Sequence, residues 1–250
     1  MAGKILAVGG SPDYQDSLAT ANAHVITIGN VGATAPVEKV ASMSYARIFG
    51  NSIVLPNGEV FIVGGHTWGN PFRDENSSLV PEIWNPSTRQ FTNVAVSPTP
   101  RNYHSIALLM PNATVFVGGG GLCGNCGNRN HFDGQLFAPP YLFGSDGTTA
   151  APRPQITAVS SKTPTVGATI SVTLATGART PVTFSLVRMG SSTHTINTDQ
   201  RRVPLTATAS GNTYSMRLPN DAGILLPGYW YLFALANGVP SVAQIIQVRP

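Results

Sequence analysis

Three segments of this 250-residue chain share one design, an apolar run that ends in a pair of glycines. The pairs are Gly9-Gly10, Gly64-Gly65 and Gly118-Gly119, which gives a repeat of about 54 residues. The second and third pairs each close a predicted hairpin, with turn sequences PNGE and PNAT. This spacing is typical of kelch repeats, in which one β-propeller blade takes about 50 residues. We therefore expect about three propeller blades in residues 1–150.

The two hairpin turns differ at one position. Asn57-Gly58 suits the positive φ angles of a tight hairpin turn. Ala113 stands where the earlier turn has its glycine, so the later turn either differs in type or is strained.

Three blades cannot close a propeller, which usually has about four to eight. A blade beside an open gap exposes an edge strand and half of its packing face. We therefore expect the chain to be the C-terminal part of a longer protein, prone to aggregate by itself. Whether the missing blades come from a lost N-terminal part or from another chain stays open.

The pattern changes near residue 151, where the proline-broken stretch APRPQI indicates a linker. Short alternating runs then follow, separated by turn signals, at 169–175, 182–190, 213–219, 228–241 and 244–250. This arrangement predicts an immunoglobulin-like β-sandwich of about 100 residues. The chain as a whole is expected to be all-β, with a propeller part at 1–150 and a sandwich domain at 151–250.

Charge and hydropathy exclude two classes of partner. The formal charge is +4, but the basic residues are scattered and only three are lysine, so no stripe for nucleic acid is expected. No apolar run approaches the ~18–20 residues of a membrane span. The N-terminus lacks the apolar core of a signal peptide, yet Asn76 and Asn112 begin glycosylation sequons. A secreted protein without its N-terminal part reconciles these features.

Tyr103 and His104 stand side by side, and His194 lies in the polar stretch GSSTHTINTDQRR. Most single histidines are ordinary surface or hydrogen-bonded residues. Neighbouring side chains of a regular strand point to opposite faces, so Tyr103 and His104 reach one ion only where the pleat is irregular. Pro98 and Pro100 place a loop just upstream. Imidazoles with a phenolate oxygen favour copper over zinc.

Two further motifs also suggest chemistry. Cys123-x-x-Cys126 reads as half of a zinc site without its second pair, as a redox motif without the required helix, or as a short disulfide. We favour the disulfide. Glycines 118–121 are not a phosphate-binding loop, because no Lys-Ser/Thr signature follows them.

Longer motifs show a specific resemblance. Residues 103–126 and NHFDGQLFAPPYL (130–142) resemble the last kelch blade of the galactose oxidase family of copper radical oxidases. STHTINTDQRRVPL (192–205) and LPGYWYLFALANGVPSVA (226–243) resemble that family's C-terminal early-set (E-set) domain. The likeness covers essentially the whole chain.

The resemblance implies a site with one copper ion on the axis of a seven-bladed propeller, held by two histidines and two tyrosines. Tyr103 matches the axial tyrosine that takes the substrate's proton, and His104 and His194 match the two histidines. Cys123 and Cys126 match the family's short disulfide. The residues that match the substrate-binding mouth of the site are Tyr14, Gln15, Phe49 and Phe72.

The family's second tyrosine, which carries a radical and is cross-linked to a cysteine, has no match in this chain. The resemblance implies that the chain is the C-terminal part of a secreted copper radical oxidase that is a monomer when complete. Such an enzyme oxidises a primary alcohol such as galactose and reduces O2 to H2O2. The chain by itself is expected to be inactive. Two alternatives stay open: a glyoxal-oxidase-like or broader alcohol oxidase, and a non-catalytic kelch and E-set module that binds carbohydrate or protein.

Overall fold

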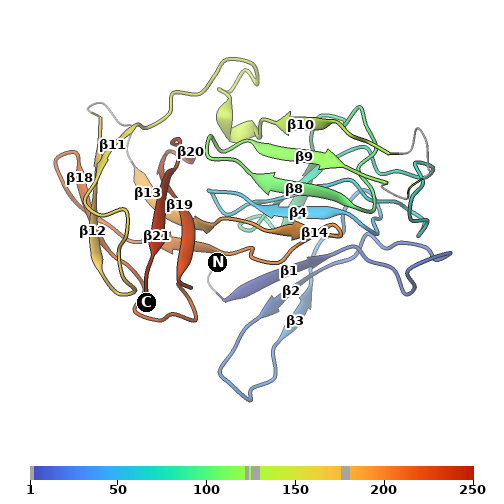
Figure 1. Cartoon of the computed structure of the whole chain (residues 1–250), viewed down its shortest axis with the longest axis horizontal. Helices are drawn as coiled ribbons and strands as arrows, with labels where there is room; N and C mark the ends of the chain where they lie inside the picture. The colour runs from blue at the N-terminus through green and yellow to red at the C-terminus, as the bar shows by residue number, and fades with distance from the viewer. Residues whose placement is uncertain (1–2, 122–123, 125–129, 176–180) are drawn as a thin grey trace.

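The computed structural model describes residues 3–121, 124, 130–175 and 181–250. Three antiparallel sheets stand at one end of the molecule and a two-sheet sandwich stands at the other (Figure 1). The fold is all-β, as expected from the sequence. Within the described part of the chain, no helix has the length and apolar character needed to cross a membrane.

The three antiparallel sheets follow one another along the chain and are the expected propeller blades. The first contains β1 (Lys4–Val8), β2 (Ala23–Thr27) and β3 (Val37–Lys39). The second contains β4 (Asn51–Val54), β5 (Val60–Val63), β6 (Glu82–Asn85) and β7 (Gln90–Asn93). The third contains β8 (Ser105–Leu109), β9 (Val115–Gly119) and β10 (Gly134–Phe137). The sheets do not close into a ring, so the prediction of a partial propeller is confirmed.

The glycine pairs let neighbouring blades approach closely. Gly64 has a φ of 72°, and a Cβ atom there would lie 1.9 Å from the carbonyl oxygen of Arg101. The next residue, Gly65, donates its N–H to the same oxygen at 2.8 Å. Gly9 stands in the same relation to Arg47, with 2.5 Å between the hypothetical Cβ and the carbonyl oxygen. No L side chain fits at either position, which explains the first two of the three glycine pairs.

Ala113, in the hairpin turn of the third blade, has a strained backbone conformation. Its φ is 65°, and its N–H bonds to Met110 O at 2.8 Å, just as Gly58 bonds to Leu55 O at 2.9 Å. The turn type is therefore kept and the alanine bears a left-handed conformation, at a cost of about 1–2 kcal/mol. Its methyl group is fully buried in the contact with the sandwich.

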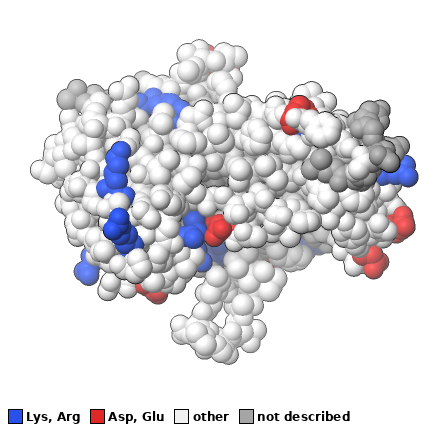
Figure 2. Space-filling model, in the orientation of Figure 1, with Lys and Arg blue, Asp and Glu red and all other residues white. Residues whose placement is uncertain are grey.

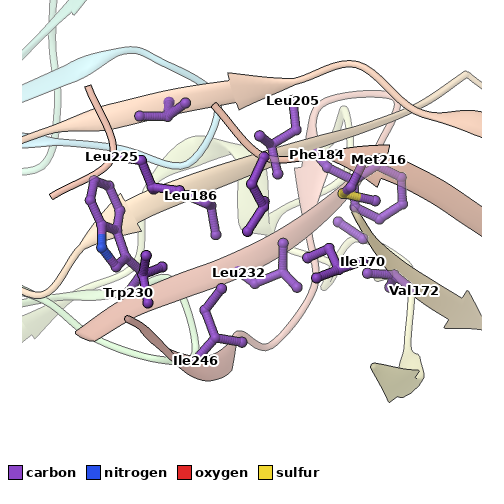
Figure 3. Close-up of a cluster of buried hydrophobic side chains, with 14 of the residues drawn as sticks. Ile170, Val172, Phe184, Leu186, Leu205, Met216, Leu225, Trp230, Leu232 and Ile246 are labelled. Atoms are coloured by element: carbon purple, nitrogen blue, oxygen red, sulfur yellow. The ribbon is translucent and has the colours of Figure 1, made fainter. Parts of the chain in front are cut away.

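The C-terminal part is the predicted immunoglobulin-like sandwich, reached through a short 3-10 helix, η2 (Pro140–Leu142). One sheet contains β11 (Ile156–Val159), β12 (Thr169–Leu174), β18 (Thr213–Arg217) and β17 (Thr208–Ser210). The facing sheet contains β16 (Arg202–Leu205), β13 (Val182–Arg188), β19 (Gly228–Ala236), β20 (Val239–Pro240) and β21 (Gln244–Val248). Side chains from both sheets, including Phe184, Trp230 and Met216, interdigitate in one core (Figure 3). The predicted boundary after residue 150 falls between β10 and β11.

The sandwich packs firmly on the third blade. Strands β13 and β19 are buried on both faces, because their second face is covered by the blade. Val187, Tyr231 and Phe233 make this apolar contact together with Ala113. The Tyr141 hydroxyl donates to Ala113 O at 2.6 Å across the same junction. On the face in Figure 2, most Lys and Arg side chains lie over the sandwich.

One hairpin leaves the sandwich and lies among the blades. It consists of β14 (Ser192–Thr193) and β15 (Ile196–Asn197), which contact the inner strands β4 and β8 (Figure 1). Gln200, just beyond it, binds the β4 backbone: its Oε1 accepts from Val54 N at 2.7 Å and its Nε2 donates to Ser52 O.

Replacing Gln200 with alanine leaves one N–H and one C=O of β4 without these partners. We expect a loss of about 1–3 kcal/mol in the free energy of unfolding, the usual cost of unpaired polar groups away from water. Urea unfolding measures the loss. The exposed Gln155→Ala variant is the matched control and should keep the parental midpoint. Equal midpoints for the two variants would contradict a role for Gln200 in holding the hairpin.

Candidate metal centre

Tyr103 and His104 lie on one side of the chain although they are neighbours in sequence. Their rings stack with centroids 4.0 Å apart and an interplanar angle of 29°. His104 has a φ of 68°, which breaks the alternation of an extended strand. Strand β8 begins only at the next residue, Ser105. The irregular backbone therefore lies just after the loop that Pro98 and Pro100 predict.

His194 reaches the same place from the sandwich half of the chain. It occupies the tip of the β14–β15 hairpin, where His194 and Thr195 both have positive φ, 51° and 63°. A two-residue turn with this backbone normally uses Asn-Gly, so the turn is strained. The His194 ring centroid lies 5.2 Å from that of His104 and 6.0 Å from that of Tyr103.

Both imidazoles have one nitrogen already engaged. Nδ1 of His104 lies 2.8 Å from the carbonyl oxygen of Gly121, which only accepts, so Nδ1 carries the proton and Nε2 keeps its lone pair. Nδ1 of His194 lies 2.7 Å from Oγ1 of Thr193. Metal-binding histidines commonly have their other nitrogen held in this way. The arrangement therefore presents two oriented imidazoles beside one phenol.

Three aromatic side chains surround this cluster. Tyr14, Phe49 and Phe72, here called the aromatic wall, have ring centroids 5.5, 5.1 and 5.2 Å from that of Tyr103. Phe72 also contacts the His104 ring at 5.5 Å. The structure thus brings together six of the predicted site residues.

Gln15 is exposed in the loop that follows Tyr14. That loop is fastened to the segment before Phe72, because Asp16 N donates to Gly69 O at 2.8 Å. Cys123 and Cys126, predicted to form a disulfide, lie outside the described residues.

The Tyr14 ring contacts the Tyr103 ring edge-on, at an interplanar angle of 89°. Partial burial, followed by interaction with the neighbouring Tyr103, raises the pKa of Tyr14 to about 12. Tyr14 therefore stays protonated at neutral pH.

Backbone strain is concentrated at this cluster. Phe49, Phe72, His104 and His194 all have positive φ, between 51° and 68°. Each such residue costs of order 1–3 kcal/mol and persists only where its surroundings hold it. Strain of this kind gathers at functional sites, and here it aims four side chains at one point.

The donor set fits a copper ion. Among residues 3–121, 124, 130–175 and 181–250, no three His, Cys, Asp or Glu side chains gather in a way that could hold a metal. The polar groups that the structure brings to the cluster include the phenol of Tyr103 and the imidazoles of His104 and His194. Imidazole nitrogens with an oxygen ligand suit a tetragonal cupric site.

Sequence reasoning missed His66, which is fully buried beside the aromatic wall. Its ring lies 6.2 Å from the Phe49 ring, and its Nε2 lies 2.7 Å from Arg73 O. Its position directly after the second glycine pair was the available signal.

Burial lowers the pKa of His66 below its ordinary value. The unfolded chain binds a proton near the ordinary pKa of about 6.5 before the folded chain does. The stability due to neutral His66 is thus complete above about pH 6.5 and is lost as the pH falls toward the lowered pKa. His66→Gln should lose less stability than the parent between about pH 7.5 and 5.5 in urea unfolding. Equal losses in His66→Gln and in the parent would contradict the prediction.

The fold combines a partial kelch propeller with an immunoglobulin-like sandwich. Two imidazoles and a phenol cluster where these two parts meet. Fold and cluster together are typical of copper oxidases. Two family models match it: glyoxal oxidase N-terminus over residues 2–139 and the galactose oxidase-like Early set domain over residues 153–248. The protein belongs to the galactose oxidase family of copper radical oxidases.

Individual relatives agree with the family models. The chain is 50% identical to a galactose oxidase of Gibberella zeae over 250 residues, which cover 98% of this chain and 36% of the relative. It is 29% identical to the aldehyde oxidase GLOX1 of Arabidopsis thaliana, over 88% of this chain and 38% of that protein. A solved fungal alcohol oxidase of the AA5 family, in complex with copper, matches with a TM-score of 0.95 and 45% identity, covering 100% of this chain and 52% of that one. The chain thus spans little more than a third of the length of these two curated relatives.

Proposed function

We propose that Tyr103, His104 and His194 are copper ligands and that the protein is the C-terminal part of a copper-dependent oxidase of primary alcohols. The observation that supports this most is the convergence of three rings from two separate parts of the fold, with centroids 4.0 to 6.0 Å apart. A non-catalytic binding module would have no need for oriented imidazoles beside a phenol, or for the strain that places them.

The reaction proposed for the complete enzyme converts a primary alcohol and O2 into an aldehyde and H2O2. When bound, copper would supply the redox chemistry together with a radical cofactor. Tyr103 takes the hydroxyl proton of the alcohol, for which its oxygen must come within hydrogen-bond reach of the substrate. Tyr14, which stays protonated and lies with its ring 5.5 Å from that of Tyr103, is proposed to orient that oxygen and to support its negative charge.

The aromatic wall provides the substrate-binding surface. The rings of Tyr14, Phe49 and Phe72 pack against C–H faces or an apolar group of the alcohol and exclude water. Gln15, exposed beside Tyr14, offers an amide to a substrate hydroxyl. Galactose-type primary alcohols suit this combination of apolar faces and polar groups.

Three of the family's four copper ligands are proposed here, and the radical tyrosine with its cross-linked cysteine has no match in the chain. The chain alone is therefore proposed to be inactive. The complete protein is proposed to be secreted and monomeric, with Cys123 and Cys126 joined as a disulfide. Its partners are the alcohol and O2, with no nucleic acid and no membrane.

A broader alcohol or aldehyde oxidase is the second candidate. It is favoured by the match to the glyoxal oxidase model over residues 2–139 and by the similarity to plant aldehyde oxidases.

Two experiments test the proposal. Titration of this chain with Cu²⁺, followed by electron paramagnetic resonance, should show a site with two nitrogen ligands, and failure to bind would overturn the ligand assignment. The full-length, copper-loaded protein is then supplied with galactose, benzyl alcohol or glyoxal, and H2O2 formation is measured. Faster turnover of galactose than of the other two substrates would identify a galactose-type oxidase. Faster turnover of benzyl alcohol or glyoxal would identify the broader oxidase. No turnover of any of them would favour a non-catalytic binding module.

A further inference from the structure

His66 links the two backbone segments that carry the phenylalanines of the aromatic wall. Its N–H and C=O exchange hydrogen bonds with Ile48, both 2.9 Å, directly before Phe49. Its side-chain Nε2 lies 2.7 Å from the carbonyl oxygen of Arg73, directly after Phe72. One fully buried residue is thus bound one position away from each phenylalanine.

The chemistry of these contacts gives the ring a fixed role. A carbonyl oxygen accepts only, so Nε2 of His66 must carry the proton and donate. The imidazole edge also contacts the Phe49 ring, with centroids 6.2 Å apart and planes at 83°. The His66 side chain therefore touches one phenylalanine and holds the segment of the other.

The segment that carries Phe72 is tied to the candidate ligands as well. Asn102 donates from Nδ2 to Arg73 O at 2.9 Å and also contacts Ser77 Oγ at 2.9 Å. Asn102 is buried and directly precedes Tyr103. The Arg73 carbonyl oxygen is therefore shared by two buried donors, one beside the Phe49 segment and one beside Tyr103.

Both phenylalanines need such restraint. Phe49 and Phe72 have φ values of 61° and 62°, a left-handed backbone that bulky residues rarely adopt. Without a restraint, each segment relaxes and its ring leaves Tyr103. Ser78 Oγ also donates to Ala46 O at 2.9 Å, but the hydrogen bond from His66 to Arg73 O is the contact that lies one position from Phe72.

We propose that His66 is a positioning residue that sets the separation of Phe49 and Phe72 and thereby determines which alcohols are admitted to Tyr103. This proposal rests on the proposed oxidase function. Alcohols with a flat apolar group contact both rings and depend on their separation, whereas glycerol is small enough to bind without them.

The test compares His66→Leu and His66→Gln in the full-length, copper-loaded protein. Leucine fills the space but cannot donate, whereas the glutamine amide restores a donor at the place of Nε2. His24→Leu, a histidine change on β2 of another blade, is the matched control. The readouts are kcat and KM for benzyl alcohol and for glycerol, copper affinity by chelator competition, and hydrogen exchange of the peptide 69–78.

The expected result for His66→Leu is faster exchange in 69–78 and a KM for benzyl alcohol raised about tenfold. Its KM for glycerol, its kcat and its copper affinity should stay at the parental values. His66→Gln and His24→Leu should match the parent throughout. If His66→Leu does not fold, His66→Asn replaces it, because the shorter amide cannot reach Arg73 O.

An unchanged ratio of the two KM values, with exchange of 69–78 also unchanged, would overturn the proposal. So would equal losses of kcat for both alcohols, which indicate general damage. If the parent oxidises neither alcohol, the proposed function fails, whereas hydrogen exchange still decides whether His66 restrains the Phe72 segment.

Discussion

Replacing His194 by alanine in the full-length protein should lower copper affinity by ~100-fold or more and reduce alcohol oxidation to background. Loss of a group that merely supports a ligand costs about 10- to 100-fold in affinity, so the loss of a ligand should cost at least as much. The effect should be local, because His194 is an exposed side chain at the tip of a hairpin and not part of the core. Chelator competition measures the affinity, and urea unfolding of the metal-free protein should be unchanged.

The matched control is His24→Ala, a histidine of β2 outside the cluster. It should bind copper like the parent. Parental affinity in His194→Ala would show that the hairpin brings its imidazole near His104 without contributing to a metal site.

Replacing Glu82 by alanine should destabilise the protein by about 3–5 kcal/mol, the usual cost of removing one partner of a buried ion pair. Glu82 and Arg47 are bonded at 2.9 Å with side-chain exposures of 0% and 2%. The carboxylate also accepts from Ser44 N at 2.7 Å and from Tyr45 N at 3.2 Å, so its loss leaves two amides without their partner and the buried guanidinium without its counter-charge. Burial lowers the pKa of Arg47 from its ordinary value, although the neighbouring Glu82 carboxylate opposes the shift.

Glu38→Ala is the control for this ion pair. Glu38 pairs with Arg89 at 2.7 Å, but both side chains are exposed, 62% and 42%. Because exposed pairs contribute little, no measurable change is expected. Urea unfolding followed by tryptophan fluorescence suits both variants, since the buried Trp84 lies two residues from Glu82 on β6. Similar midpoints for Glu82→Ala and Glu38→Ala would show that the buried pair does not hold the second blade together.

Much of the fold was readable from local patterns. A glycine pair recurring about every 54 residues predicted the blades, because only glycine permits the approach of a carbonyl oxygen to 1.9 Å from the place of a Cβ atom. Arg47 and Arg101, whose carbonyl oxygens lie against Gly9 and Gly64, are separated by the same period. Alternating short runs predicted the sandwich, and the family resemblance was confirmed by the family models and relatives.

The site was predictable only in part. A family resemblance in the sequence predicted Tyr103, His104 and His194 as site residues. Their roles as copper ligands stay a prediction. His66 was not predicted, because a single histidine in a sequence gives no signal of which groups it will bind in the folded chain. Its function depends on Ile48 and Arg73, which only the folded chain places beside it.

The sequence by itself determined the class of fold, since strand alternation and glycine spacing are properties of neighbouring residues. Only the tertiary structure decided that His194, about 90 residues beyond His104, lies 5.2 Å from it ring to ring. That proximity depends on the apolar junction between sandwich and blade, on Gln200 at β4, and on positive φ angles that no local propensity favours. Local sequence determines strands and turns, but strain at a site persists only because the packed surroundings oppose its release.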